Sequence, residues 1–415
     1  MKVKERFYEL PSCTEVLFGK EIKLLPSVSE LFELELAFLE YRSLPSNELL
    51  NRSAYIQSIN GKFTKHYLMY RKYPVPISEN RSAFTKRYFE EGQFSTGYAT
   101  HGLFPYRGKF HPQLIKSLLN IMGIEKGQTV LDPMCGSGTA NIEASMLGIN
   151  SYGADISPFC QFMTKTKYEA LTILSDRLIE LSDKADTMFS FFNTNNIFDK
   201  LGRIKNLDDL KIYHLLLLAF LDAMGYARRV SSANHQQLYK KVFSRYINTV
   251  SDFLNNPQYD YKDIGWVKVL PDSEALNLEL EENSIDGIIF SPPYSFAIDY
   301  AQNDNPQLTY LGYSVSELKS KMVGLIGRTK AERLNRYFQD MEKICYEVHR
   351  VLKINKYFVM IIGSNTNQTG GIRLEKKIIE FSEKIGLSLV KSILKPIKGL
   401  RNTMKNEYIL IFKKK

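Results

Sequence analysis

The chain has 415 residues, of which 44% are hydrophobic and 24% are charged. Such a composition is typical of soluble globular proteins and excludes a disordered, collagen-like or coiled-coil chain. No apolar run approaches the roughly 20 residues that a membrane-spanning helix needs, and the first residues lack the apolar stretch of a secretory signal. We therefore expect a cytoplasmic protein without a membrane partner.

The charge favours a polyanionic partner. The chain contains 55 Lys and Arg residues against 45 Asp and Glu residues, a formal net charge of +10. A balance of this kind suits nucleic acid, although many basic enzymes bind none. The four cysteines are scattered and the six histidines show no ligand spacing, so we expect neither a disulfide framework nor a metal site.

Residues 1–95 are predicted to form a small N-terminal unit. Short apolar patches alternate there with turn residues, and the second half is rich in Lys, Arg, Tyr and Phe. Cations interleaved with aromatic rings are typical of a surface that follows a phosphate backbone. A solvated, Lys-rich face over a small core explains the same pattern, so both interpretations stay open.

Residues 96–165 show the first alternation of helix and strand. A helix begins at Pro112, a short buried strand covers Thr129–Asp132, and a helix over Ala140–Leu147 leads to a second strand over Ser151–Asp155. The two strands and the helix between them form one βαβ unit. We assign this segment to the first part of an α/β domain.

Residues 166–265 are predicted to be mostly helical. One helical stretch runs to about Phe192, and two more cover Leu207–Gly225 and Asn234–Leu254. No part of the segment alternates between apolar and polar residues as a half-buried strand does. We interpret it as a helical insertion that serves either as a target-recognition element or as a cap.

Strand–helix alternation resumes in residues 266–415. The predicted strands are Trp266–Leu270, Ile285–Phe290, Tyr357–Gly363, Ser388–Leu394 and Glu407–Phe412, and the predicted helices are Tyr337–Leu352 and Leu374–Ile385. The last two strands form a terminal hairpin, which makes the sheet mixed rather than purely parallel. The segment is the second part of the α/β domain.

A Gly-rich turn follows the first strand. It reads Asp132, Pro133, Met134, Cys135, Gly136, Ser137, Gly138 and Thr139. The two glycines let the backbone turn sharply and approach a ligand closely, and the next helix offers free N–H groups. A dinucleotide site requires a third glycine where Asn141 stands, and a P-loop requires Gly-Lys-Ser/Thr. The acid before the turn suits a cofactor that carries an amino group, such as S-adenosylmethionine.

Two further acids lie where a nucleoside would bind. Asp155 ends the second strand, about 20 residues after the Gly-rich turn, where a carboxylate accepts hydrogen bonds from ribose hydroxyls. Asp272 and Ser273 follow the strand Trp266–Leu270, and Asp272 is placed to accept from the adenine amine. A helix N-cap for Asp155 and a surface position for Asp272 are the structural alternatives.

The second motif is Ser291-Pro292-Pro293-Tyr294, at the carboxyl end of the buried strand Ile285–Phe290. Ligands of such sheets bind outside the carboxyl ends of the strands. Two prolines stiffen the turn and remove two N–H donors, which leaves the Ser291 hydroxyl and the Pro292 carbonyl as acceptors. With the Tyr294 ring as a stacking plate, this set fits the exocyclic amine of a flat base.

The two motifs together resemble the amino-methyltransferases, a family of class I methyltransferases. The resemblance implies an α/β, Rossmann-like fold with a mixed seven-stranded sheet, and S-adenosylmethionine as the cofactor. Family members methylate adenine N6 or cytosine N4 in DNA, and some relatives methylate RNA guanine. Ser291 before the prolines is similar to the cytosine-N4 enzymes. The cofactor motif precedes the Pro-Pro motif by about 150 residues, which is not the common cytosine-N4 order.

The resemblance also assigns residue roles. The residues that hold the cofactor are Asp132, Pro133, Cys135, Gly136, Ser137, Gly138, Thr139, Asp155, Ile156, Asp272, Ser273 and Phe110. The catalytic, base-binding set is Ser291, Pro292, Pro293 and Tyr294. The charge pattern, rather than the resemblance, predicts nucleic-acid contacts for Lys109, Arg228, Arg229, Lys319, Lys321, Arg328 and Arg401, with an ordinary solvated surface as the alternative. Cys135 lies in the cofactor turn and is not expected to act as a nucleophile.

The sequence therefore predicts a DNA methyltransferase acting on cytosine N4 of a flipped base, within restriction-modification or defence and with a cognate endonuclease as a partner. Adenine N6 in DNA and guanine N2 in RNA are the alternative targets. A nucleic-acid-binding protein that has kept the fold without activity is the rival from another functional class.

Overall fold

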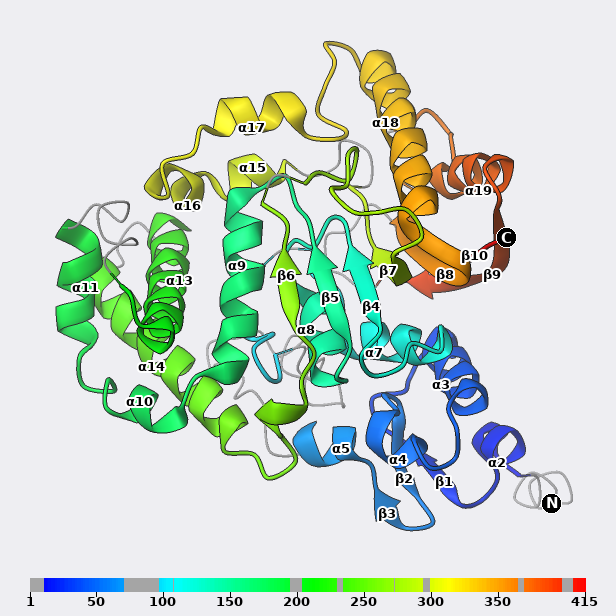
Figure 1. Cartoon of the computed structure of the whole chain (residues 1–415), viewed down its shortest axis with the longest axis horizontal. Coiled ribbons are helices and arrows are strands. Elements are labelled where there is room, and N and C mark those ends of the chain that lie inside the picture. The colour runs from blue at the N-terminus through cyan, green and yellow to red at the C-terminus, as the bar shows by residue number, and fades with distance from the viewer. Residues whose placement is uncertain are drawn as a thin grey trace, which may run out of the picture. The chain divides into compact units, whose positions relative to one another are not determined.

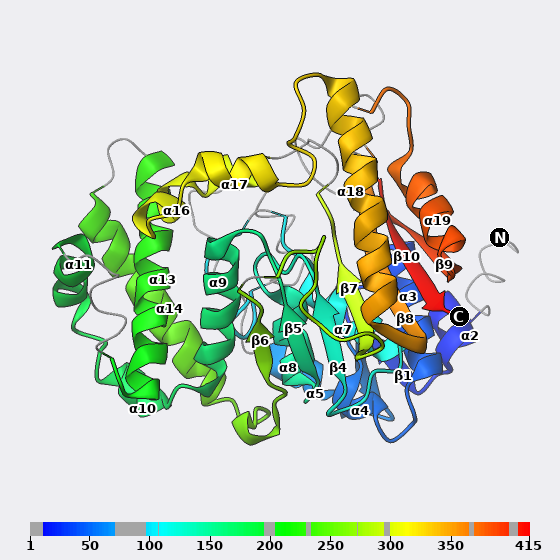
Figure 2. The same cartoon turned by 45° about the horizontal axis from the view of Figure 1, so that its top comes forward.

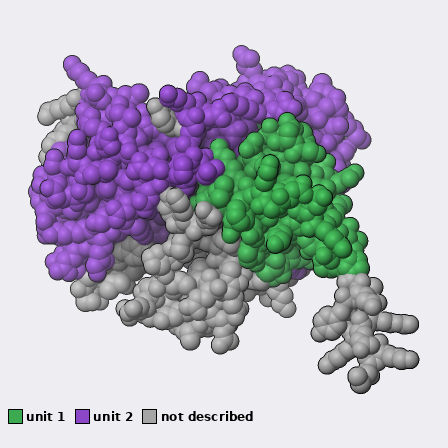
Figure 3. All heavy atoms as spheres, turned by 90° about the horizontal axis from the view of Figure 1, so that it is seen from below, with its two compact units in different colours: residues 1–98, 111–124 green, residues 99–110, 125–415 purple. Residues whose placement is uncertain are grey.

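The computed structural model describes residues 11–70, 97–106, 108–194, 204–229, 234–271, 273–293, 299–364, 369–397 and 406–415. The chain divides into two compact units, which Figure 3 distinguishes by colour. The first unit comprises residues 1–98 and 111–124, and the second comprises residues 99–110 and 125–415.

The first unit combines a small antiparallel sheet with short helices. Its strands are β1 (Ile22–Leu24), β2 (Ile56–Ile59) and β3 (Lys62–Phe63), and its helices are α2 (Cys13–Phe18), α3 (Leu31–Ser43), α4 (Leu49–Arg52), α5 (Lys65–Tyr70) and α7 (Pro112–Ile121). The fully buried Glu40 carboxylate accepts hydrogen bonds from the Ala54 N–H at 2.8 Å and from the Asn120 side chain at 2.6 Å. Since Glu40 lies on α3 and Asn120 on α7, this buried acid joins the two helices.

The second unit is built around a seven-stranded sheet (Figure 1). Its strands, in spatial order, are β6 (Val267–Val269), β5 (Asn150–Gly153), β4 (Thr129–Asp132), β7 (Ile285–Phe290), β8 (Leu352–Gly363), β10 (Asn406–Lys414) and β9 (Leu387–Pro396). Strand β10 pairs antiparallel with both β8 and β9, whereas the other strand pairs described in this sheet are parallel. The predicted mixed seven-stranded α/β sheet is confirmed.

Two helices near the end of the chain cover one face of this sheet (Figure 2). These are α18 (Lys330–Val351) and α19 (Leu374–Lys384). Apolar side chains of α18, including Tyr337 and Val348, pack in one core with alternate residues of the strands, such as Ile288 and Phe358. All six residues of β7 are buried, which is the pattern of a central parallel strand.

Most of the other helices of the unit lie in the chain between β4 and β6. They are α8 (Thr139–Met146), α9 (Pro158–Glu169), α10 (Ser175–Ile179), α11 (Ala185–Thr194), α13 (Leu207–Arg229) and α14 (His235–Leu254), with 3-10 turns η1 (Ala170–Thr172) and η2 (Tyr261–Asp263). Residues 166–265 are thus mainly helical where they are described, as predicted. Among the described residues, no helix is long and apolar enough to cross a membrane.

Three short helices that the sequence did not predict follow the Pro-Pro motif. They are α15 (Tyr300–Asn303), α16 (Asn305–Tyr310) and α17 (Val315–Lys321). The prediction that α18 begins at Tyr337 is also wrong, because the helix begins at Lys330. Its first two turns are polar, and a capping box between Thr329 and Glu332 marks the true start.

Candidate active site

The two predicted motifs leave the sheet at neighbouring points. Strand β4 pairs in parallel with β7, with Leu131 opposite Ile288. The Gly-rich turn follows β4 directly, and Ser291 follows β7 directly. Because parallel neighbours end on the same edge of a sheet, both motifs open at one carboxyl edge, where ligands of such folds bind.

The Gly-rich turn depends on two left-handed backbone positions. Gly136 has φ +50° and Gly138 has φ +76°, a region that favours glycine. Gly138 is the N-cap of α8, and its N–H donates to the Cys135 carbonyl at 2.7 Å. A Cβ atom on Gly138 would lie 2.8 Å from the Thr164 Oγ1 atom. The close approach of α9 therefore requires glycine here.

Asp155, just after β5, connects the end of that strand to the Gly-rich turn by hydrogen bonds. Its carboxylate accepts from the Gly136 N–H at 2.9 Å and from the Ser157 N–H at 2.8 Å. The side chain is only half-buried by its neighbours, yet desolvation raises the pKa of its carboxyl to about 6, against the opposing effect of the two N–H donors. Each carboxylate oxygen keeps a lone pair for another donor such as a ribose hydroxyl.

Asp132, at the end of β4, holds an unsatisfied acceptor. Its Oδ1 atom accepts from the Met134 N–H at 3.1 Å, whereas its buried Oδ2 atom has no hydrogen-bond partner among the described residues. Burial raises the pKa of this carboxyl well above its usual value, and the nearby Asp155 adds to the effect. A cationic donor such as an ammonium group would satisfy the acceptor and favour the carboxylate. These carboxylate acceptors therefore fit the ammonium and ribose hydroxyl donors of S-adenosylmethionine.

An aromatic pair beside the turn was missed by sequence reasoning. The Tyr106 and Tyr300 rings are stacked with centroids 6.2 Å apart and an interplanar angle of 15°. A Cβ atom on Gly136 would lie 3.5 Å from the Tyr106 ring. Tyr300 opens α15, shortly after the Pro-Pro motif, so the pair links the cofactor turn to the segment that follows the base motif. Only the tertiary contact reveals this pairing.

The base motif is described as far as Pro293. Ser291 and Pro293 are half-buried and Pro292 is buried. Tyr294 lies outside the described residues, as do Asp272 and Arg401. Shortly after the motif, Lys319 of α17 donates to the Asp299 carboxylate at 2.7 Å. Lys319, predicted to contact nucleic acid, is thus engaged in an ion pair that fixes α17 beside this segment.

Other predicted residues have mixed environments. Pro133, Cys135, Ser137 and Thr139 are buried in or beside the turn, whereas Phe110 and Ile156 are half-buried. Ser273 is buried, and its hydroxyl accepts from the Glu279 N–H at 3.2 Å within a local turn. Lys109 donates to the His101 carbonyl at 3.0 Å, and burial lowers the pKa of its amine to about 8. The Lys109 amine is therefore held by its own segment, and its contact with nucleic acid stays a prediction.

Cys135 has the environment of a structural thiol. Burial raises the pKa of this thiol well above its usual value, and the acids Asp155 and Asp132 raise it further. The thiolate needed for nucleophilic attack is thereby disfavoured. All four cysteines are free, and the described part of the chain contains no group of three or more His, Cys, Asp or Glu residues that could hold a metal ion.

The Asp155 carboxyl predicts a pH dependence of cofactor binding. Its pKa of about 6 means that it gains a proton as the pH falls through 6, which removes acceptor capacity for ribose hydroxyls. We expect the affinity for S-adenosylhomocysteine to be constant near pH 8 and to decline below pH 6, as measured by calorimetry. Asp155→Asn should flatten this decline, and a decline of equal size in that variant would contradict the role.

Comparisons with known proteins find similarity to methyltransferases. Residues 103–201 match the family model of the RMKL-like methyltransferase domain. The type II methyltransferase M.BsoBI of Geobacillus stearothermophilus is 26% identical over 349 residues, which cover 69% of this chain and 68% of that protein. The type II methyltransferase M.MjaII of Methanocaldococcus jannaschii is 25% identical over 221 residues, 46% of this chain and 41% of that protein.

A further match is short. The tRNA (guanine(10)-N2)-dimethyltransferase of Methanothermobacter thermautotrophicus is 42% identical over 53 residues, 13% of this chain and 16% of that protein. The longer matches are all to methyltransferases. The structure is consistent with them, because it places the Gly-rich turn with its acids and the Ser-Pro-Pro segment on adjacent strands of the sheet. The chain is therefore similar to S-adenosylmethionine-dependent methyltransferases, including type II DNA methyltransferases.

Proposed function

We propose that this protein methylates the exocyclic N4 of cytosine in DNA. The observation that carries the proposal is the placement of the Gly-rich turn and the Ser-Pro-Pro segment on adjacent parallel strands, β4 and β7. A cofactor bound at the Gly-rich turn and a base bound at the Ser-Pro-Pro segment would therefore meet at the same edge of the sheet. The serine before the two prolines, in place of Asp or Asn, supports cytosine as the base.

Each part of the site has a chemical task. Bound S-adenosylmethionine supplies an electrophilic methyl group on a positively charged sulfur. The Gly136 and Gly138 backbone, Asp132 and Asp155 would hold that cofactor. The Ser291 hydroxyl and the Pro292 carbonyl would accept hydrogen bonds from the target amine and so stabilise the positive charge that develops on nitrogen. Most of the remaining rate enhancement would come from holding the reacting groups in line.

DNA must be held while the base is turned out of the helix, at a cost of a few kcal/mol. The connection between α17 and α18 supplies cations for this purpose. Lys321, Arg328 and Lys330 are exposed there, and no ion pair is found for them among the described residues. Arg228 and Arg229 are the last residues of α13 and stay predicted contacts. We propose that Lys321, Arg328 and Lys330 bind the phosphate backbone.

The double variant Lys321→Ala, Arg328→Ala should weaken DNA binding and its dependence on salt. Each lost phosphate contact should reduce the slope of log K against log salt by about 0.9, because fewer counterions are released. Fluorescence anisotropy with a labelled duplex measures the slope. Lys343→Ala, which removes an exposed cation farther along α18, is the control. Equal slopes for the double variant and the unaltered protein would remove this loop from the interface.

Two other targets are kept as alternatives. Adenine N6 in DNA requires the same grip on an exocyclic amine. Guanine N2 in RNA is favoured by the short match to a protein named as a tRNA (guanine(10)-N2)-dimethyltransferase. That match covers too little of this chain to carry its substrate over, so DNA stays the first proposal.

Product identification separates these targets. The full chain is incubated with tritiated S-adenosylmethionine and with DNA of diverse sequence or with RNA, and each nucleic acid is digested to nucleosides for mass spectrometry. The proposal predicts N4-methyldeoxycytidine. N6-methyldeoxyadenosine or N2-methylguanosine as the product would support the adenine or the guanine alternative instead. If no nucleoside is labelled, the protein would be a nucleic-acid-binding protein without methyltransferase activity.

The setting that we propose is restriction-modification or defence, with a cognate endonuclease as the partner. The type II methyltransferases among the relatives support it. Plasmid DNA propagated with this protein should resist cleavage by one endonuclease specificity and not by others. Unchanged sensitivity to every endonuclease tested, together with methylated product, would contradict this setting while keeping the activity.

A further inference from the structure

One residue beside the cofactor turn has an unusual backbone. Phe104, in the segment 99–110 of the second unit, has φ +55°, a conformation that bulky side chains rarely adopt. Such a conformation persists when its surroundings over-determine it. The Phe104 carbonyl accepts from the Tyr106 N–H at 2.8 Å, so the bend at Phe104 sets the direction of Tyr106.

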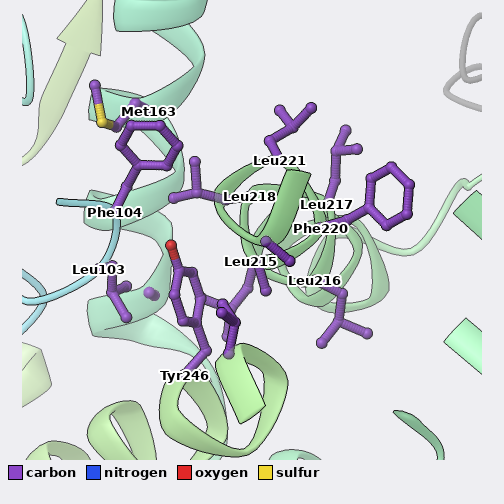
Figure 4. Packing of buried hydrophobic residues seen from close by; sticks show 14 of the residues in the cluster. Leu103, Phe104, Met163, Leu215, Leu216, Leu217, Leu218, Phe220, Leu221 and Tyr246 are labelled. Atoms are coloured by element: carbon purple, nitrogen blue, oxygen red, sulfur yellow. The ribbon is translucent and has the colours of Figure 1, made fainter. Parts of the chain in front are cut away.

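The helical insertion holds this bend. The Phe104 N–H hydrogen-bonds to the hydroxyl of Tyr246, a fully buried residue of α14. Figure 4 shows that hydroxyl directed at the backbone that carries Leu103 and Phe104. Tyr246 in turn donates to the buried Asp222 carboxylate of α13 at 3.2 Å, which also accepts from Arg245. Two helices of the insertion thus converge on one backbone N–H.

The bend leads directly to the cofactor turn. The Tyr106 ring lies beside Gly136 and stacks on Tyr300. The side chains of Leu103 and Phe104 share their core with α9, α13 and α14, and with residues of the segment after the base motif such as Leu308. Any relaxation at Phe104 is therefore transmitted to the ring that borders the Gly-rich turn.

We propose that Tyr246 is a positioning residue for the cofactor site. Through its bond to Phe104, the helical insertion keeps the strained segment in place and holds Tyr106 against the Gly-rich turn. This gives the insertion a task in cofactor binding, whatever it contributes to reading DNA. The inference rests on the cofactor and is independent of the target base, so product identification and the following test can fail separately.

The test is Tyr246→Phe, which removes only the hydroxyl. Tyr239→Phe is a matched control, because Tyr239 is fully buried in the same core and on the same helix, and its hydroxyl has no hydrogen-bond partner among the described residues. We expect Tyr246→Phe to weaken binding of S-adenosylhomocysteine about 2- to 10-fold in calorimetry, the effect of one lost hydrogen bond. Hydrogen exchange at the Phe104 amide should accelerate in the same variant, and Tyr239→Phe should change neither quantity beyond twofold.

Equal behaviour of the two variants would overturn the proposal, as would faster exchange at Phe104 with unchanged affinity. If Tyr246→Phe does not fold, the unaltered protein decides the matter. Its Phe104 amide must exchange slowly and become slower when S-adenosylhomocysteine is bound. An amide that exchanges at the rate of an open chain, or that ignores the ligand, would also overturn the assignment.

Discussion

Asp155→Ala is expected to weaken the binding of S-adenosylmethionine by roughly 1–3 kcal/mol, about 5- to 150-fold. The carboxylate is assigned to the ribose hydroxyls, and it also accepts from the Gly136 and Ser157 N–H groups. Its loss therefore removes a charge-assisted contact to the ligand and releases one end of the Gly-rich turn. Calorimetric titration with S-adenosylhomocysteine measures the change.

A control removes an acid elsewhere. Asp183→Ala takes away one exposed negative charge of the helical insertion and should leave the affinity within twofold. Asp155→Asn keeps one acceptor oxygen and should fall between the alanine variant and the unaltered protein. An affinity that Asp155→Ala does not change would remove the ribose role and leave Asp155 as a cap of the turn.

Gly138→Ala should have the second large effect. Alanine at φ +76° carries roughly 1–2 kcal/mol of backbone strain, and overlap with Thr164 adds roughly 1–3 kcal/mol. The variant must either shift the start of α8 or move α9, and both distort the cofactor turn. We expect a lower melting temperature and loss of measurable cofactor binding.

Gly127→Ala separates the two causes of that effect. Gly127 also has positive φ, at +83°, but no atom lies within 4 Å of a Cβ at this position. The Gly127→Ala variant should therefore lose only the stability that backbone strain costs, and it should bind the cofactor as the unaltered protein does. Adding Thr164→Ala to Gly138→Ala removes the closest side-chain atoms and should restore part of the binding. Identical melting temperatures and affinities for the Gly127 and Gly138 variants would show that close approach to α9 is not required.

The central strands were predictable because they are buried on both faces. Thr129–Asp132 and Ile285–Phe290 coincide with β4 and β7, since a short apolar run beside turn residues leaves few alternatives. Strand β8 begins at Leu352, five residues before the predicted start at Tyr357. Its first residues include the exposed Ile354 and Asn355, Asn355 has φ +63°, and the pairing with β7 shifts register before Tyr357, so this stretch does not follow a regular strand.

The helices near the site were harder to predict. Helices α15, α16 and α17 have four to seven residues each, too few for an apolar period to stand out. They are stabilised instead by the core that they share with the insertion, in which Leu308 and Leu318 pack with residues of α13 and α14. Such packing between distant segments leaves no periodic trace in a sequence.

The candidate site shows the same division between local and tertiary signals. The Gly-rich turn, Asp155 and the Ser-Pro-Pro segment follow from spacing relative to predicted strands. The stacking of Tyr106 on Tyr300 and the hydrogen bond between Tyr246 and Phe104 join segments more than a hundred residues apart, so no local pattern predicts them. Lys109 is another case, because its hydrogen bond to the His101 carbonyl has no counterpart in the sequence pattern.

A structure determined with S-adenosylhomocysteine and a target duplex bound together would test the central claim most directly. We predict the cofactor product on the Gly136–Gly138 backbone with its ribose at Asp155, and an extrahelical cytosine whose amine contacts Ser291 and Pro292 at the same edge of the sheet. A base held at another edge of the sheet, or a cofactor product bound away from the Gly-rich turn, would contradict it.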